Sequence, residues 1–184
     1  MSLPPSVVLG LDPGTRHFGW GVVERRGTKL VHRGHGIVHT DTDEPLASRL
    51  VAIESSLVDV VRAHAPSVAS VEALFFAKDA QAAAKLGHAR GVALLVCARA
   101  GLAVHEYPPA LVKRAVAGGG RAEKPQVAQM VRIVLGLASA PPTDAADALA
   151  VALTHLQRLV LPPTSPTRTA LPQALLSQGP RRSK

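Results

Sequence analysis

The sequence has few of the residues that would place it in several large classes of protein. One cysteine, Cys97, in 184 residues excludes an intramolecular disulfide framework and a cysteine-based zinc site, and it fits a reducing compartment. Five aromatic residues are too few for a broad base-stacking surface. The longest apolar run, residues 92–98, is far shorter than the ~20 residues of a membrane-spanning helix. The N-terminal segment MSLPP lacks the basic region of a signal peptide, so we expect a cytoplasmic protein without membrane association.

Positive charge and apolar side chains are plentiful by comparison. Twenty-one Lys and Arg residues stand against thirteen Asp and Glu, which gives a net charge of +8. The hydrophobic content of 47% is enough for one real core. A basic excess on a chain of this size points to a polyanionic partner, with nucleic acid first.

The charge is unevenly distributed along the chain. Residues 162–184 contain five prolines, four basic residues and no acidic ones, without helical or strand periodicity. We interpret residues 1–161 as a single folded domain and residues 162–184 as a basic, proline-rich disordered tail. The tail contributes half of the net charge, so we expect it to strengthen general DNA binding and to be dispensable for catalysis.

Hydrophobic periodicity predicts strands that are followed by alternating strands and helices. The first three strands form an antiparallel meander, and the order of the elements indicates a mixed-sheet α/β fold. Two glycines, Gly87 and Gly91, interrupt the second predicted helix. The predicted strands cover residues 7–11, 19–24, 30–39, 68–72 and 102–106, and the predicted helices cover residues 44–64, 78–100, a short segment after Pro109, 125–135 and 143–159.

Four carboxylates stand out by their positions. Asp12 and Glu72 each end a buried strand, where open α/β sheets place their ligand sites. Asp144 and Asp147 are three residues apart in the last helix and share one face of it. If the four converge, their mutual repulsion needs a counter-charge, which a pair of Mg²⁺ or Mn²⁺ ions would supply. The alternative is that each is a turn or cap residue.

Several motifs, taken in order, resemble one family. From about residue 7 to residue 157, the chain is similar to the RuvC family of Holliday-junction resolvases. A lone Asp-Pro-Gly-Thr would be weak, but the ordered set is specific. It consists of LGLDPGTR (residues 9–16), GWGV (19–22), Glu72 with FFAK (75–78), AKLGHARG (84–91), AEK (122–124) and DAADALA (144–150).

The resemblance implies an RNase H-like α/β fold, with a mixed sheet of about five strands flanked by helices on both faces. It implies a homodimer that nicks four-way DNA junctions symmetrically in recombination and repair, alongside a branch-migration motor of the RuvA–RuvB type. Two metal ions would activate a water and leave 5′-phosphate ends. The residues matching the family's catalytic and metal-binding carboxylates are Asp12, Glu72, Asp144 and Asp147. The third of them varies between Asp and His in the family, and Ala73 stands where a glutamine is common.

Other residues in and between these motifs are candidate DNA contacts. Phe75 and Phe76 follow Glu72, and one of the rings could stack on an unpaired base at the crossover, with Phe75 favoured by the resemblance. Packing in the core is the alternative for either ring. Arg16, Lys113 and Lys124 are candidate phosphate contacts, and the alternative for each is a solvated surface charge.

Small residues cover most of the second predicted helix. Gly87 and Gly91 lie four residues apart on it, which allows another helix to approach closely. A two-fold interface would suit a junction that is itself roughly two-fold. Ordinary packing on the sheet is the alternative, and we interpret Cys97 on the same helix as a small buried side chain.

Two further functions compete with the nuclease. A non-catalytic junction-binding protein of the same fold would use the basic surface and keep the carboxylates for structure. An actin-like phosphotransferase shares the Asp-Pro-Gly-Thr turn, but the chain is too short for two such lobes. The loop at residues 118–124 lacks the Gly-Lys-Ser/Thr ending of a Walker A motif, so we exclude a nucleotide site there.

Overall fold

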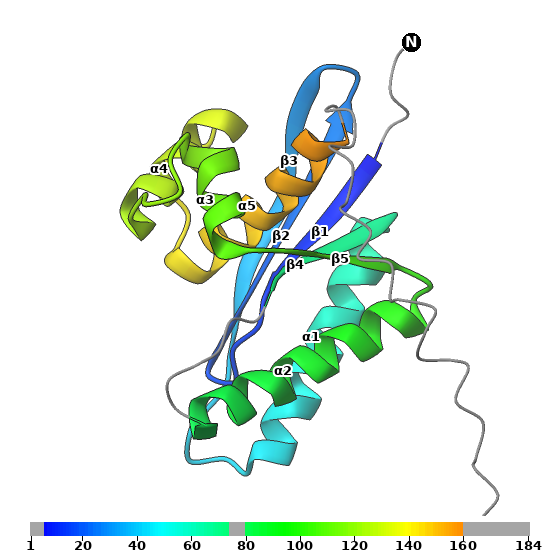
Figure 1. Cartoon of the computed structure of the whole chain (residues 1–184). Helices are drawn as coiled ribbons and strands as arrows, with labels where there is room; N and C mark the ends of the chain where they lie inside the picture. The colour runs from blue at the N-terminus through cyan, green and yellow to red at the C-terminus, as the bar shows by residue number, and fades with distance from the viewer. Residues whose placement is uncertain (1–5, 74–79, 160–184) are drawn as a thin grey trace, which may run out of the picture.

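The computed structural model describes residues 6–73 and 80–159 (Figure 1). One five-stranded sheet has the order β3-β2-β1-β4-β5. Strand β2 pairs antiparallel with both β1 and β3, whereas β4 pairs parallel with both β1 and β5. The elements are β1 (Ser6–Asp12), β2 (His17–Arg26), β3 (Lys29–His39), α1 (Leu46–His64), β4 (Val68–Glu72), α2 (Ala80–Arg99), β5 (Ala103–Tyr107), α3 (Pro109–Ala117), α4 (Lys124–Leu135) and α5 (Thr143–Arg158).

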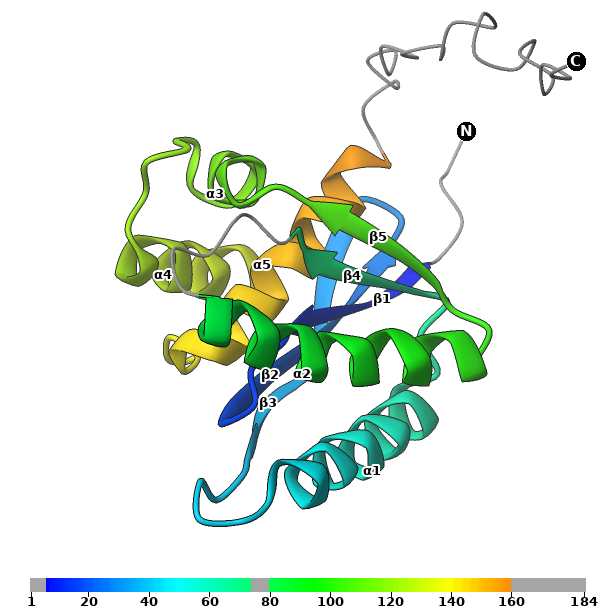
Figure 2. The same cartoon turned by 60° about the horizontal axis from the view of Figure 1, so that its bottom comes forward.

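Helices cover both faces of this sheet, as Figures 1 and 2 show, with α1 and α2 on one face and α3, α4 and α5 on the other. Each face has its own buried apolar cluster. Leu9 and Leu11 of β1 pack with Ile53 of α1, while Val8 of the same strand packs with Leu149 and Leu153 of α5. The predicted mixed α/β sheet of five strands with helices on both faces is confirmed.

The predicted elements are all present, and their ends differ for local reasons. Strand β2 is longer than predicted because its pairing with β3 continues to Arg26 and Lys29, on either side of the Gly27 turn. Helix α1 begins at Leu46, after Pro45. The predicted interruption of the second helix is wrong, since α2 runs unbroken through Gly87 and Gly91. Glycine weakens a helix by about 1 kcal/mol without breaking it, and buried Ala89 and Ala93 hold the other face of α2 in the core.

Helix α5 is the central helix of its face and is almost entirely buried. It lies directly on two strands at positions where those strands have no side chain. A Cβ atom at Gly10 would overlap the carbonyl oxygen of Ala148, and one at Gly19 would overlap that of Asp144. A Cβ at Gly21 would lie 2.6 Å from Cγ of Leu149. Glycines in β1 and β2 therefore set how closely α5 approaches the sheet.

We expect Gly10→Ala to destabilise the protein by at least about 3 kcal/mol or to prevent folding, because the added methyl group meets backbone that cannot move aside. Gly119→Ala is the matched control, since its Cβ would have nothing within 4 Å and its φ is not positive. Urea unfolding of the two variants measures the difference. Equal stabilities would contradict the close seating of α5.

No helix in the described part of the chain combines the length and the apolar character needed to cross a bilayer.

Candidate active site

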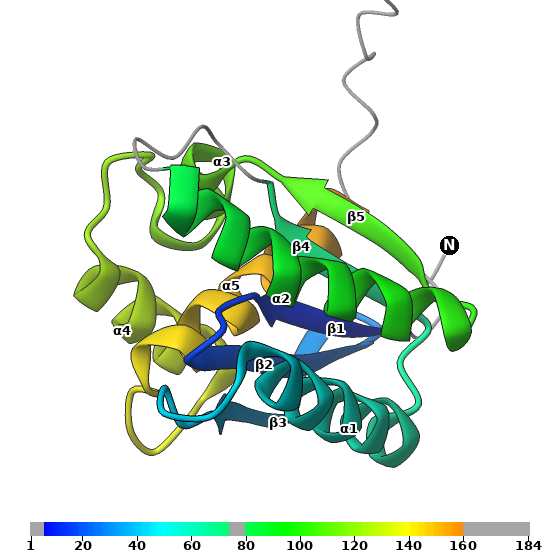
Figure 3. The same cartoon turned by 90° about the horizontal axis from the view of Figure 1, so that it is seen from below.

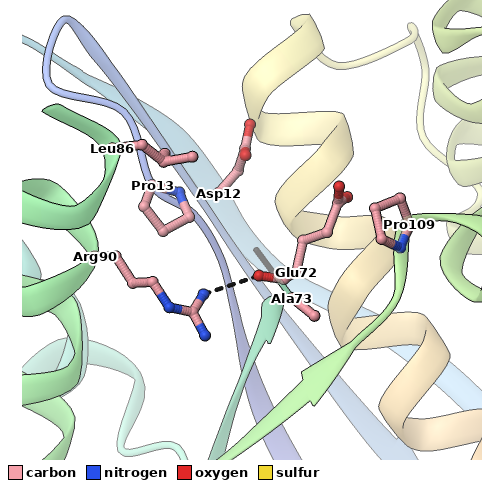
Figure 4. Close-up of a pocket in the computed structure, with 7 residues that line it drawn as sticks. All are labelled: Asp12, Pro13, Glu72, Ala73, Leu86, Arg90 and Pro109. Carbon is pink, nitrogen blue, oxygen red and sulfur yellow. Dashed lines mark hydrogen bonds between the residues drawn. The ribbon is translucent and has the colours of Figure 1, made fainter. Parts of the chain in front are cut away.

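Asp12 and Glu72 end two neighbouring parallel strands and project to the same face of the sheet. Along β1, Val8 packs on the α5 face, Leu9 on the opposite face and Leu11 again on the opposite face. Because side chains alternate along a strand, Asp12 returns to the α5 face. The register pairs Leu11 with Val71, so the same alternation carries Glu72 to that face. Figure 4 shows both carboxylates pointing the same way, beside α5.

The other two carboxylates come from α5. Asp144 lies in its first turn and Asp147 one turn later, both half-buried. The backbone of α5 at Asp144 lies over Gly19, beside the end of β1, since Gly19 pairs with Asp12. The close seating of α5 thus brings its first turns to the ends of β1 and β4.

The electrostatics reflect this convergence. Burial, together with the charges of Asp147, Asp144 and Glu72, raises the pKa of Asp12 from 3.8 to about 7. Burial and the charge of Asp147 also raise the pKa of Glu72. Burial is the largest cause of both shifts, and neighbouring negative charge that the surroundings do not fully compensate adds to it. The four predicted residues therefore form one electrostatically coupled group.

Two lysines supply part of the missing positive charge. Lys124, the first residue of α4, places its Nζ 2.7 Å from Oδ2 of Asp147. This contact raises the pKa of Lys124. The charge of Lys124 works against the upward pKa shifts of Asp12 and Glu72, and that of Lys113 on α3 works against the shift of Glu72. Two of the three predicted phosphate contacts, Lys113 and Lys124, therefore lie close to the carboxylates.

The donor set suits a hard divalent cation, because carboxylate oxygens are the preferred ligands of Mg²⁺ and Mn²⁺. The uncompensated charge at Asp12 is what such a cation would neutralise. In the conformation of the described residues, no three His, Cys, Asp or Glu side chains are grouped closely enough to hold a metal ion. Lys124 already engages one carboxylate, Asp147. For three of these carboxylates to hold one metal ion, their side chains would have to move closer together.

A cavity of about 220 Å³ adjoins the strand ends (Figure 4). Arg90 of α2, which we did not predict as a site residue, lies on its wall. It is 6% exposed, and the sequence signal for it was a single charge on the buried side of a mostly apolar helix. The residues lining this cavity are Asp12, Pro13, Glu72, Ala73, Leu86, Arg90 and Pro109.

The remaining residues singled out in the sequence lie in different places. Arg16 is exposed in the turn between β1 and β2, with its backbone carbonyl accepting a hydrogen bond from the amide of Thr40. Phe75 and Phe76 lie outside the described residues. Ala73 lines the cavity and donates its amide to the carbonyl of Tyr107.

Comparison with known proteins gives a consistent result along the domain. The family model described as crossover junction endodeoxyribonuclease RuvC matches residues 8–155. A protein of that name from Sorangium cellulosum is 60% identical over 149 residues, which cover 81% of this chain and 83% of the relative. The protein of that name from Methylorubrum populi is 54% identical over 148 residues, covering 80% and 78%.

Solved structures agree with these sequence matches. Thermus thermophilus RuvC in complex with a Holliday junction superposes with a TM-score of 0.79 at 41% identity, covering 84% of this chain and 94% of the other. The yeast mitochondrial Holliday junction resolvase shares the fold at 13% identity, with a TM-score of 0.58 and coverage of 84% and 79%. With its fold, its carboxylate group and its sequence all in agreement, the chain belongs to the RuvC family of crossover junction endodeoxyribonucleases.

Proposed function

We propose that this protein cuts four-way DNA junctions by paired symmetric nicks, in recombination and repair. The observation that carries the proposal is the convergence of Asp12, Glu72, Asp144 and Asp147 at one edge of the sheet, with Lys113 and Lys124 beside them. The Thermus relative bound to a Holliday junction supports the choice of substrate. A non-catalytic junction-binding protein would have no need for a buried group of carboxylates that repel one another.

The four carboxylates would hold two Mg²⁺ ions, with Mn²⁺ as the other candidate. When bound, such ions supply an activated water and stabilise the leaving oxygen of a phosphodiester, leaving a 5′-phosphate. Asp12 is positioned between β2 and β4, with Glu72 on one side and Asp144 on the other.

Basic side chains near the carboxylates would orient the DNA. Lys124 and Lys113 come from α4 and α3, on either side of the loop at residues 118–123. We propose that a cation at the carboxylates frees Lys124 from Asp147 to contact a phosphate, with Arg16, in the turn after Asp12, as a further phosphate contact. That the ring of Phe75 or Phe76 stacks on an unpaired base at the crossover stays a prediction from the resemblance.

We propose a homodimer through the exposed side of α2, facing away from the sheet (Figure 3). Leu95 is 46% exposed there, and Gly87 and Gly91 have open space where a Cβ would stand. A symmetric dimer would present two active sites to a roughly two-fold junction. Cooperation with a RuvA–RuvB type motor stays an expectation from the family.

The tail, residues 162–184, would add an electrostatic attraction to DNA that does not depend on the DNA sequence. Its four basic residues and absence of acidic ones predict that a chain ending at residue 161 binds DNA with a shallower dependence on salt. We expect that chain to cleave junctions at a normal rate once bound.

A synthetic four-way junction tests the activity directly. We expect symmetric nicks only when Mg²⁺ or Mn²⁺ is present, detected on denaturing gels with each strand labelled in turn. Asp12→Asn should abolish cutting and retain junction binding, because phosphate contacts dominate affinity. Binding without cutting by the wild-type protein, in either metal, would favour the non-catalytic alternative.

We expect Asp12→Asn to stabilise the metal-free protein, because it removes a buried charge among like charges. A gain on the order of 2 kcal/mol would raise the Tm by several degrees, since 1 kcal/mol corresponds to about 2–4 °C in a chain of this size. Mg²⁺ should raise the Tm of the wild type but not that of the variant. Asp59→Asn, at an exposed position on α1, is the control; equal effects of the two substitutions would contradict the proposed metal site.

Leu95→Asp tests the interface. A charge there should shift the protein toward monomer in sedimentation equilibrium, because it would be buried without a partner in the dimer. Val51→Asp, at an exposed apolar position on α1, is the matched control. A wild-type protein that sediments as a monomer, or a Leu95→Asp dimer, would rule out this interface.

A further inference from the structure

We propose that Arg90 is a positioning residue for Glu72: its guanidinium replaces a hydrogen bond that the sheet cannot make at the end of β4. This role rests on the proposed function, in which Glu72 is a metal ligand. Arg90 NH1 donates to the carbonyl oxygen of Glu72 at 2.8 Å. Figure 4 shows the guanidinium reaching from α2 to the strand end, on the opposite side from the Glu72 carboxylate.

The need for this donor follows from the strand pairing. The amide of Ala73 donates to the carbonyl of Tyr107 at 2.8 Å, toward β5. Backbone groups of successive residues in a strand point to opposite neighbours, so the carbonyl of Glu72 faces β1. There, the residue after Asp12 is Pro13, which has no N–H to donate. A buried carbonyl without a donor is costly, and Arg90 supplies one.

The guanidinium has a second partner that fixes its orientation. Arg90 NH2 lies 2.7 Å from Oε1 of Glu106, on β5. Arg90 is 8% exposed at the side chain, whereas Glu106 is 53% exposed. One planar guanidinium thereby joins α2 to the ends of β4 and β5. The carboxylate of Glu72 projects from the residue whose backbone is held in this way.

This arrangement explains why a charged residue stands on the buried side of α2. Asp12 and Asp147 have other anchors: Asp12 is paired with Gly19 in the β1–β2 ladder, and Asp147 lies within α5. Glu72 is the last residue of β4, and on its β1 side the chain leaves the sheet after Asp12, at Pro13. Glu72 is also paired with Tyr107 of β5. Small displacements of a ligand reduce both metal affinity and rate, so loss of the Arg90 contact on the β1 side should lower both.

Substitutions of Arg90 test the role in the full-length protein. Arg90→Ala removes both contacts. Arg90→Lys keeps the positive charge but lacks the planar guanidinium that reaches the Glu72 carbonyl and Glu106 together. We expect Mn²⁺ binding without DNA, followed by the electron paramagnetic resonance signal of free Mn²⁺, to weaken at least fivefold in Arg90→Ala and less in Arg90→Lys. The cleavage rate at saturating junction should fall at least tenfold in Arg90→Ala, with partial rescue in Arg90→Lys. Junction affinity without divalent ions should stay within twofold.

Arg99→Ala is the matched control, because Arg99 lies on the same helix and pairs with Glu54 of α1, away from the site. It should leave Mn²⁺ binding and cleavage unchanged. If Arg90→Ala does not fold by circular dichroism, Arg90→Lys and Glu106→Gln decide the matter. Folded variants with wild-type Mn²⁺ affinity would overturn the proposal. Absence of cleavage by the wild-type protein would instead refute the proposed function, because the Mn²⁺ measurement does not depend on it.

Discussion

The close contact between α5 and the sheet is the constraint on which the rest of the site depends. Gly10 and Gly19 leave room for the carbonyls of Ala148 and Asp144, so a helix backbone lies where side chains would otherwise stand. The same contact buries one face of the core and carries two acidic residues to the strand ends. Stability and site geometry are therefore set by one packing interaction. A change that lifts α5 away from β1 would loosen the core and separate the carboxylates together.

This packing keeps an excess of negative charge at the site. Burial and neighbouring carboxylates raise the pKa of Asp12 to about 7, and Lys124 compensates only part of the negative charge through Asp147. A bound cation would stabilise a site of this kind. Arg90 adds no direct contact to a carboxylate of the group; it acts on the backbone that carries one of them.

Local sequence patterns predicted all the helices and strands, but they failed for features that depend on tertiary packing. Continuous apolar runs placed β1 and β4, because a strand covered on both faces has to present apolar side chains to both helix layers. The predicted break in α2 was wrong, since the buried side of that helix outweighs the cost of two exposed glycines. The burial of His155 was not predicted either, and its Nδ1 lies 2.7 Å from the hydroxyl of Tyr107. Burial lowers its pKa to about 4.

The sequence alone determined the fold class and the family and supplied the four candidate carboxylates, because strand ends, helix spacing and an ordered set of motifs are local properties that can be recognised along the chain. Only the tertiary structure decided that Lys124 pairs with Asp147 and that Arg90 holds the end of β4. Both depend on which segments meet in space. Pro13 illustrates the difference. In the sequence it marks a turn, but in the fold its missing N–H leaves the carbonyl of Glu72 without a backbone donor. Arg90, 77 positions after Pro13, supplies the donor instead.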